Sequence, residues 1–267
     1  RSPWKHSGFQ RLRGLKTGTG KVSSEAFLIE GGYQVLLAQN STYTIQEIWI
    51  EDGRDFKLPK PTSAKIYKLT PGLMRKLFPT GKKVDVVGVC RLPDLYVQMR
   101  RIGGRILLLE DIQDPGNLGT IFRCAEAFGF LDVICVMSSE TAISRIFSRV
   151  TIRASMGSIF RIRLYIIPSA AEAIDFLDRR NITFFASTPH SEFTLEDLTS
   201  RLSSMGEGEI YAIGVGNEAS GLSRKFLEFS QKFPNFPVRI SMLGSVESLN
   251  VAVACGIILH RCHPEPR

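Results

Sequence analysis

The second half of the chain alternates short apolar runs with helical stretches, and this alternation constrains the fold more than any other feature. Several of the runs are apolar throughout instead of alternating apolar with polar residues. Strands that are buried on both faces have this character, and they occur in parallel sheets covered by helices on both sides. The sequence therefore predicts a doubly wound α/β domain whose ligands bind at the carboxyl ends of its strands.

The expected elements of this half follow one another in regular order. Strands are expected at residues 106–109, 133–137, 162–167, 182–186, 210–215 and 238–242. Helices are expected at residues 118–128, 170–180, 223–229 and 249–261.

The first hundred residues predict a smaller α/β unit. An amphipathic helix is expected over 24–39, and strands over 45–51, 65–69 and 84–90. Thr70 and Pro71 are typical of the N-cap and first residue of a short helix that reaches Leu77. The predicted division is a basic α/β domain over 1–98, a linker over 99–104 and a second domain over 105–267.

The positive charge of the chain is confined to the first of these domains. Residues 1–100 contain 17 Lys+Arg and 8 Asp+Glu, a net charge of +9, whereas residues 101–267 contain 17 and 18, a net charge of −1. A basic module joined to a near-neutral one is typical of a polyanion-binding domain attached to a catalytic domain. A basic surface that only aids solubility would give the same charges.

Other features narrow the class of protein. The five cysteines are scattered without a CxxC pair, which favours a reducing compartment, the cytoplasm, over a disulfide scaffold. No apolar stretch reaches the ~20 residues that span a membrane, and no secretory signal is recognised at the N-terminus. His260, Cys262 and His263 lack further partners, so no metal site is expected.

Three segments that follow expected strands combine glycines with polar residues: 111–129, 214–223 and 240–254. Taken singly, each has an ordinary structural explanation. Asn117 is a reasonable helix N-cap, and Ser245 or Ser248 could cap the last helix with Asn250 on its first turn. Glu218 could be a loop residue, and Arg123 could be structural or could address the same ligand as Asn117.

The sequence motifs of several familiar chemistries are absent from the chain. The first strand of the second domain leads into Glu110-Asp111-Ile112 without the Gly-x-Gly turn of a dinucleotide-binding domain. Gly81-Lys82-Lys83 lacks the glycine spacing of a phosphate-binding loop. No G-x-S-x-G elbow is present to support a nucleophilic serine.

Together and in this order, the three segments resemble the motifs of the SpoU/TrmH family of RNA 2′-O-ribose methyltransferases, within the SPOUT superfamily. The resemblance covers roughly 106–260 and includes the loop Ala154-Ser155-Met156-Gly157. Around Phe27 and Ile45, the first domain resembles the ribosomal-protein-like substrate-binding domain of many members. One departure is Ser241, where the third motif usually has proline.

The resemblance implies a trefoil-knotted domain that binds S-adenosylmethionine in the knot and works as a homodimer on RNA, without a metal or a membrane. The cofactor-binding positions it implies are Gly216, Ile240 and Leu249. Its catalytic positions are Asn117, Arg123, Glu218, Ser248 and Asn250. Arg123 would engage an RNA phosphate and assist deprotonation of the ribose, or act purely by positioning and electrostatics.

Ribosomal RNA is the expected substrate, because the first domain looks like a ribosomal-protein-like domain. Four basic residues are candidate phosphate contacts: Arg11, Arg13, Lys16 and Lys21. A solvated basic tail is the alternative for these four. The alternatives for the whole chain are a transfer RNA substrate, a non-catalytic ribosome-assembly factor on the same fold, and an enzyme of antibiotic resistance.

Overall fold

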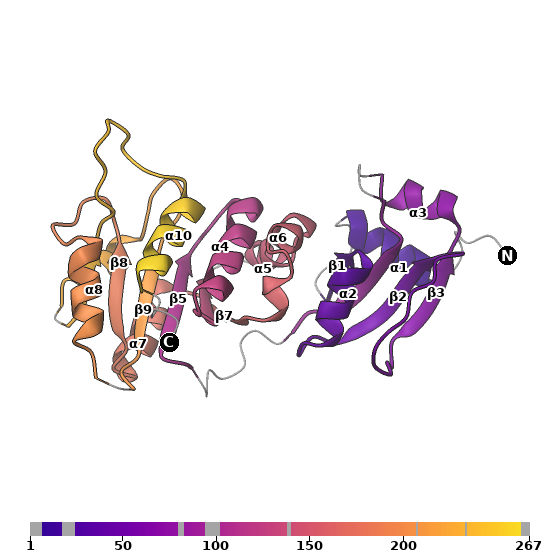
Figure 1. Cartoon of the computed structure of the whole chain (residues 1–267), viewed down its shortest axis with the longest axis horizontal. Coiled ribbons are helices and arrows are strands. Elements are labelled where there is room, and N and C mark those ends of the chain that lie inside the picture. The colour runs from indigo at the N-terminus through magenta and orange to yellow at the C-terminus, as the bar shows by residue number, and fades with distance from the viewer. Residues whose placement is uncertain are drawn as a thin grey trace.

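The structure is a computed structural model that describes residues 7–17, 25–79, 83–93, 102–137, 140–206, 208–232 and 234–262. It contains two sheets, one in each half of the chain, which lie side by side along the long axis of the molecule (Figure 1). The α/β class predicted from the sequence is confirmed for both halves.

The second half contains a six-stranded sheet in the order β10-β8-β9-β5-β6-β7. All neighbouring strands of this sheet run parallel, as the uniformly apolar runs predicted. The strands are β5 (Arg105–Glu110), β6 (Asp132–Val136), β7 (Arg163–Ile167), β8 (Thr183–Ser187), β9 (Tyr211–Val215) and β10 (Phe236–Val238).

Helices cover both faces of this sheet. One face packs against α4 (Pro115–Ala127), α5 (Glu140–Ile146), α6 (Arg149–Ala154), α8 (Leu195–Ser203) and α10 (Val251–Cys262). The other face packs against α7 (Ala170–Arg179) and α9 (Arg224–Ser230). The side chains of β5 alternate between the two cores, because Leu107 and Leu109 face the first and Ile106 and Leu108 the second. A short 3₁₀ helix, η3 (Ser158–Phe160), follows α6.

The first half contains a mixed four-stranded sheet in the order β1-β4-β2-β3. Strand β4 runs antiparallel to both of its neighbours, whereas β2 and β3 are parallel. Its strands are β1 (Ala26–Glu30), β2 (Ile45–Glu51), β3 (Lys65–Leu69) and β4 (Val86–Arg91). Helices α1 (Ser7–Thr17) and α3 (Pro71–Leu77) pack on one face, and α2 (Gly32–Gln39) on the other.

Some sequence predictions of these elements are wrong. The single helix expected over 24–39 is β1 followed by α2, and the break falls at Gly31, whose φ of 94° is one that glycine tolerates. Strand β10 ends at Val238, the first residue of the run expected at 238–242, and residues 240–242 belong to the loop that leads to α10. Helices α1, α5, α6 and α8 were not anticipated.

The two halves share a hydrophobic core cluster, which joins residues of β1 and α2 to residues of α4 and α6. At the junction between α5 and α6, the Phe147 ring lies 4.7 Å from that of Phe27, centroid to centroid. Arg149 forms an ion pair with Glu30. Residues 99–101 of the expected linker lie outside the described residues, but Gly103, near its end, donates its N–H to Asp132 Oδ2 at 2.7 Å.

Candidate functional site

A cavity of about 290 Å³ opens at the carboxyl ends of β8 and β9, the edge of the sheet where the sequence placed ligand binding. It is bounded by three loops, which follow β8, β9 and β10. The lining includes Ser187, Thr188, His190, Val215, Gly216, Glu218, Gly221, Leu222, Leu227, Ile240, Met242, Ser248 and Leu249. All three positions that the resemblance implied for the cofactor are among them.

Gly216 sits where the loop after β9 folds back on itself. A Cβ atom at this position would overlap the backbone of Gly221 and Leu222. The loop is closed by two backbone hydrogen bonds, from Asn217 N to Gly221 O at 3.0 Å and from Gly221 N to Asn217 O at 2.9 Å. Only glycine therefore allows this tight loop, which presents backbone groups to the cavity.

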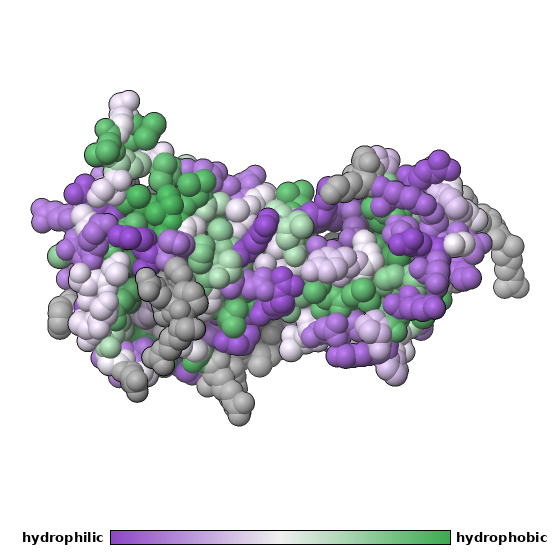
Figure 2. Space-filling model, in the orientation of Figure 1, coloured by the Kyte–Doolittle hydropathy of each residue, from purple (hydrophilic) through white to green (hydrophobic). Residues whose placement is uncertain are grey.

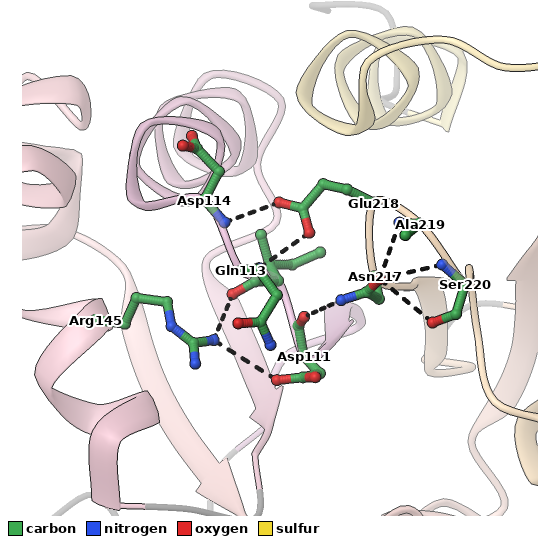
Figure 3. Close-up of polar contacts among 9 residues, drawn as sticks. Asp111, Gln113, Asp114, Arg145, Asn217, Glu218, Ala219 and Ser220 are labelled. Carbon is green, nitrogen blue, oxygen red and sulfur yellow. Dashed lines mark hydrogen bonds and ion pairs between the residues drawn. The ribbon is translucent and has the colours of Figure 1, made fainter.

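Glu218 lies on the same loop and joins it to the segment after β5. Its Oε2 accepts a hydrogen bond from Gln113 N at 3.0 Å, and its Oε1 accepts one from Asp114 N at 3.0 Å (Figure 3). Burial alone would raise the pKa of Glu218, but these two N–H donors, the N–H of Glu218 itself and the Asn117 amide lower it below its usual value. The carboxylate is therefore ionised at neutral pH and oriented by neutral donors.

Asn117 connects all three polar segments. Its Nδ2 donates to Glu218 Oε1 at 3.3 Å, and its Oδ1 accepts from Asn250 Nδ2 at 3.0 Å. Asn117 is more than a hundred positions from both partners in the sequence, and the three residues form one hydrogen-bonded series beside the cavity. The series fixes the Asn117 amide orientation, since one end must donate and the other accept.

The helix caps differ from those expected. Asp114, not Asn117, caps α4, because its side chain accepts from Asn117 N at 2.7 Å. Asn250 caps α10 in place of Ser245 or Ser248, since its Oδ1 accepts from Ala252 N at 2.9 Å. The predicted caps were wrong. The side-chain amide of Asn117 and the Nδ2 of Asn250 instead form hydrogen bonds between the segments.

Arg123 and Ser248 are the two expected catalytic positions outside this series. Arg123 is exposed on α4, less than two turns beyond Asn117. Within the described residues, its guanidinium has no hydrogen bond or ion pair. Ser248 is exposed at the rim of the cavity. Both side chains are open to a ligand.

The sequence did not single out two residues that shape this site, Asn217 and Arg145. Asn217 Nδ2 donates to Asp111 O at 3.0 Å, and its Oδ1 accepts from Ala219 N at 2.9 Å and Ser220 N at 3.1 Å (Figure 3). An asparagine directly after a glycine at a strand end was an available signal for this loop residue. Arg145 lies outside the three segments and carried no such signal.

Three of the four basic residues proposed for RNA contact lie on α1. Arg11 is half-buried and donates to Glu47 Oε1 at 3.1 Å and to Gln46, so its guanidinium packs α1 on β2. Arg13 is exposed, and Lys16 Nζ lies 6.0 Å from the ring centroid of Phe78. Lys21 lies outside the described residues.

The described residues contain no cluster of three His, Cys, Asp or Glu side chains that could hold a metal ion. In the same part of the chain, no helix has the length and apolar character needed to cross a membrane.

Residues 104–260 match the family model described as "SpoU rRNA Methylase family". Over 92% of both chains, the protein is 28% identical to the 23S rRNA (guanosine(2553)-2′-O)-methyltransferase RlmP of Bacillus subtilis. It is 30% identical to the 23S rRNA (guanosine-2′-O-)-methyltransferase RlmB of Coxiella burnetii, over 61% of this chain and 60% of that one.

Among solved structures, the fold is similar to that of the SpoU methyltransferase AviRb from Streptomyces viridochromogenes, determined in complex with the cofactor AdoMet. The TM-score is 0.78 at 22% identity, and the match covers 97% of each chain. At this identity the likeness shows a shared fold, which includes both halves of the molecule.

Proposed function

The chain belongs to the SpoU rRNA methylase family, and from this premise we propose that it transfers a methyl group from S-adenosylmethionine to a ribose 2′-hydroxyl in 23S ribosomal RNA. The observation that carries the proposal is the hydrogen-bonded series Asn250–Asn117–Glu218, which brings the three motif segments together beside one cavity. The relatives named above, which act on 23S rRNA, support the choice of RNA.

The cavity has the character that a nucleoside cofactor requires. It combines apolar side chains, such as Ile240, Leu249 and Leu227, with the backbone groups of the tight loop at Gly216. Apolar walls with a few placed polar groups are typical of sites for small cofactors. We assign cofactor binding to Gly216, Ile240 and Leu249; the bound cofactor supplies an electrophilic methyl group on a sulfonium.

The chain's own residues then have to place the ribose, whose hydroxyl loses its proton to solvent as the oxygen bonds to the methyl group. A ribose hydroxyl is a weak nucleophile near neutral pH, so alignment with the methyl group contributes much of the rate. The lowered pKa of Glu218 and its engagement with two backbone N–H groups fit an orienting carboxylate better than a base. We assign Asn117, Asn250 and Ser248 to positioning of the ribose.

Arg123 is assigned to the phosphate next to the target ribose. Its exposed guanidinium, on the helix that carries Asn117, can donate two parallel hydrogen bonds to phosphate oxygens. Because a guanidinium is protonated in proteins near neutral pH, the assigned role is to clamp the RNA and offset the charge that develops on the hydroxyl oxygen.

We assign residues 1–98 to RNA binding, 99–104 to the linker and 105–267 to methyl transfer. The net charge of +9 over residues 1–100 supports this division, because Lys and Arg supply the salt-dependent part of RNA affinity. Arg13 and Lys16 remain candidate phosphate contacts, and the guanidinium of Arg11 is hydrogen-bonded to Glu47. If the assignment is right, Arg13→Ala weakens RNA binding in a filter assay and flattens its salt dependence.

We propose that the active unit is a homodimer. Val253 and Ile257 form an exposed apolar stripe on α10, and Leu243 and Val246 are exposed on the loop that precedes it. Figure 2 shows hydrophobic side chains gathered in this region. Burial of such a patch would stabilise a dimer, and a monomer in light scattering that still transfers methyl groups would contradict it.

The trefoil knot and the cytoplasmic location belong to the same proposal. Packing of α10 on α4, next to the loop after β9, is compatible with a threaded C-terminal segment. A crystal structure traced through residues 216–262 would show whether the chain is knotted.

The five free cysteines are compatible with a reducing compartment, and fractionation of cells that express the protein would test the cytoplasmic location.

The experiment that tests the function uses purified protein, methyl-labelled S-adenosylmethionine and 23S rRNA from cells that lack the protein. We expect label in one 2′-O-methylated nucleoside after nuclease digestion and mass spectrometry. Transfer to transfer RNA but not to 23S rRNA would overturn the choice of RNA. RNA binding without any transfer by the parent protein would favour a non-catalytic assembly factor.

A further inference from the structure

Arg145 is a half-buried arginine on α5 that reaches the turn after β5. Its Nη1 donates to the Ile112 carbonyl oxygen at 2.9 Å and lies 3.6 Å from Asp111 Oδ1 (Figure 3). Only 17% of its side chain is exposed. Arg145 lies outside the three motif segments, yet it contacts the turn that leads into α4.

The hydrogen bond to Ile112 has a direct effect on Glu218. The Ile112 carbonyl and the Gln113 N–H belong to one planar peptide group, in which they point in opposite directions. Because Gln113 N donates to Glu218 Oε2, fixing the carbonyl on one side of the turn aims the N–H on the other side. Arg145 is thus two hydrogen bonds away from the carboxylate.

The turn needs an external support because it starts at an unusual backbone conformation. Asp111 has a φ of 50°, in the left-handed region that non-glycine residues adopt uncommonly. Its carbonyl accepts from Asn217 Nδ2 at 3.0 Å, so the loop after β9 holds the first residue of the turn. Arg145 holds the next peptide group, on the side away from that loop.

Arg145 is itself held firmly at the α5–α6 junction, residues 145–151. Its backbone oxygen accepts from Thr151 Oγ1 at 2.7 Å, and Thr151 is fully buried. The junction packs against the first domain through Phe147, whose ring lies 4.7 Å from Phe27 and 6.1 Å from Tyr43. A support anchored at this junction can keep a fixed position relative to the turn.

We propose that Arg145 is a positioning residue for methyl transfer, which orients the Ile112–Gln113 peptide group and, through it, the Glu218 carboxylate. The inference rests on the proposed function of the same site. It assigns a role to a residue outside the motif segments and places the support of the active-site turn on the α5–α6 junction.

The kinetic test compares Arg145→Ala with Arg145→Lys and with the matched control Arg163→Ala. Arg163→Ala also removes an ion pair, the one between Arg163 and Asp132, but this pair lies at the amino edge of the sheet. We expect Arg145→Ala to lower kcat about tenfold or more while KM for S-adenosylmethionine stays within about twofold, since Arg145 does not line the cavity. Arg145→Lys keeps one donor for the carbonyl and should restore part of kcat.

Asp111→Asn separates the two contacts of Arg145, because it removes the ion pair and leaves the Ile112 hydrogen bond. We expect a kcat within about threefold of the parent, since asparagine also tolerates the left-handed region. An Arg145→Ala kcat equal to the parent's would overturn the proposal. So would a loss of kcat in Arg163→Ala as large as that in Arg145→Ala.

A second readout does not depend on catalysis. Amide hydrogen exchange at Gln113 and Asp114 reports their hydrogen bonds to Glu218. Arg145→Ala should speed exchange at Gln113 at least about tenfold and leave the interior amides of β5 unchanged. If the parent protein transfers no methyl group, this measurement still decides the positioning role, and unchanged exchange at Gln113 would refute it.

Discussion

The two edges of the six-stranded sheet each hold a carboxylate that binds several donors, but in opposite surroundings. At the amino edge, Asp132 is 1% exposed and accepts from Arg163 Nε at 2.6 Å, Arg163 Nη2 at 2.7 Å and Gly103 N at 2.7 Å. At the carboxyl edge, Glu218 is exposed and lies beside the cavity.

The difference lies in the kind of donor and in access to solvent. The guanidinium of Arg163 neutralises Asp132. The hydrogen bond from Gly103 to Asp132 ties the residues before β5 to the sheet. The donors to Glu218 in the described part of the chain are neutral, so its negative charge remains available to the open site. Dense hydrogen bonding therefore stabilises the sheet at one edge, and at the other it orients an exposed carboxylate at the cavity.

The largest expected effect is at the carboxyl edge, in Arg123→Ala. We expect kcat/KM for methyl transfer to fall about 100-fold, because the charged donor proposed for the phosphate next to the target ribose is lost. The melting temperature should be unchanged, since Arg123 is exposed and has no described partner. Arg179→Ala, which removes an exposed ion pair on α7, is the control and should stay within about twofold.

Gly216→Ala is expected to reduce cofactor affinity about tenfold or more. The added Cβ would overlap the backbone at Gly221 and force the cavity loop apart. Isothermal titration with S-adenosylmethionine measures the effect. Gly72→Ala, where a Cβ meets nothing within 4 Å, should bind normally; equal affinities for both variants would mean that the loop does not form the cofactor site.

Asp132→Asn tests the amino edge. We expect a loss of about 2 kcal/mol in the free energy of unfolding, the usual magnitude for hydrogen bonds to a charged group, measured by urea denaturation. The kcat of the folded protein should be unchanged. A large fall in kcat without a loss of stability would remove the contrast between the edges.

The smallest expected effect is the pH dependence of the free energy of unfolding. The pKa of Glu218 is lowered from 4.5 in the folded state, so its ionised form stabilises the fold above that pH, and this contribution disappears as pH falls through the folded pKa. The stability difference between parent and Glu218→Gln should therefore be largest near neutral pH and vanish in acid. A difference that grows as pH falls would contradict the lowered pKa.

Much of the framework could be predicted from local sequence. Uniformly apolar runs determined the parallel sheet, because strands buried on both faces tolerate no polar position. The 24–39 segment was misassigned because β1 is itself buried on both faces, so its apolar residues merged with those of α2. The caps were misassigned because Asp114, Asn117, Ser248 and Asn250 are all acceptable cap residues, and local preference does not choose among them.

The sequence by itself determined the α/β class, the order of the motif segments and the residue types at the proposed site. Only the tertiary structure decided which of these groups touch. Asn117, Glu218 and Asn250 come together because three strand ends meet at one edge of the sheet. Arg145 reaches the turn at Ile112 through the fold of α5 over that edge. Hydrogen bonds between distant segments depend on chain topology, which the short-range periodicity of a sequence does not reveal.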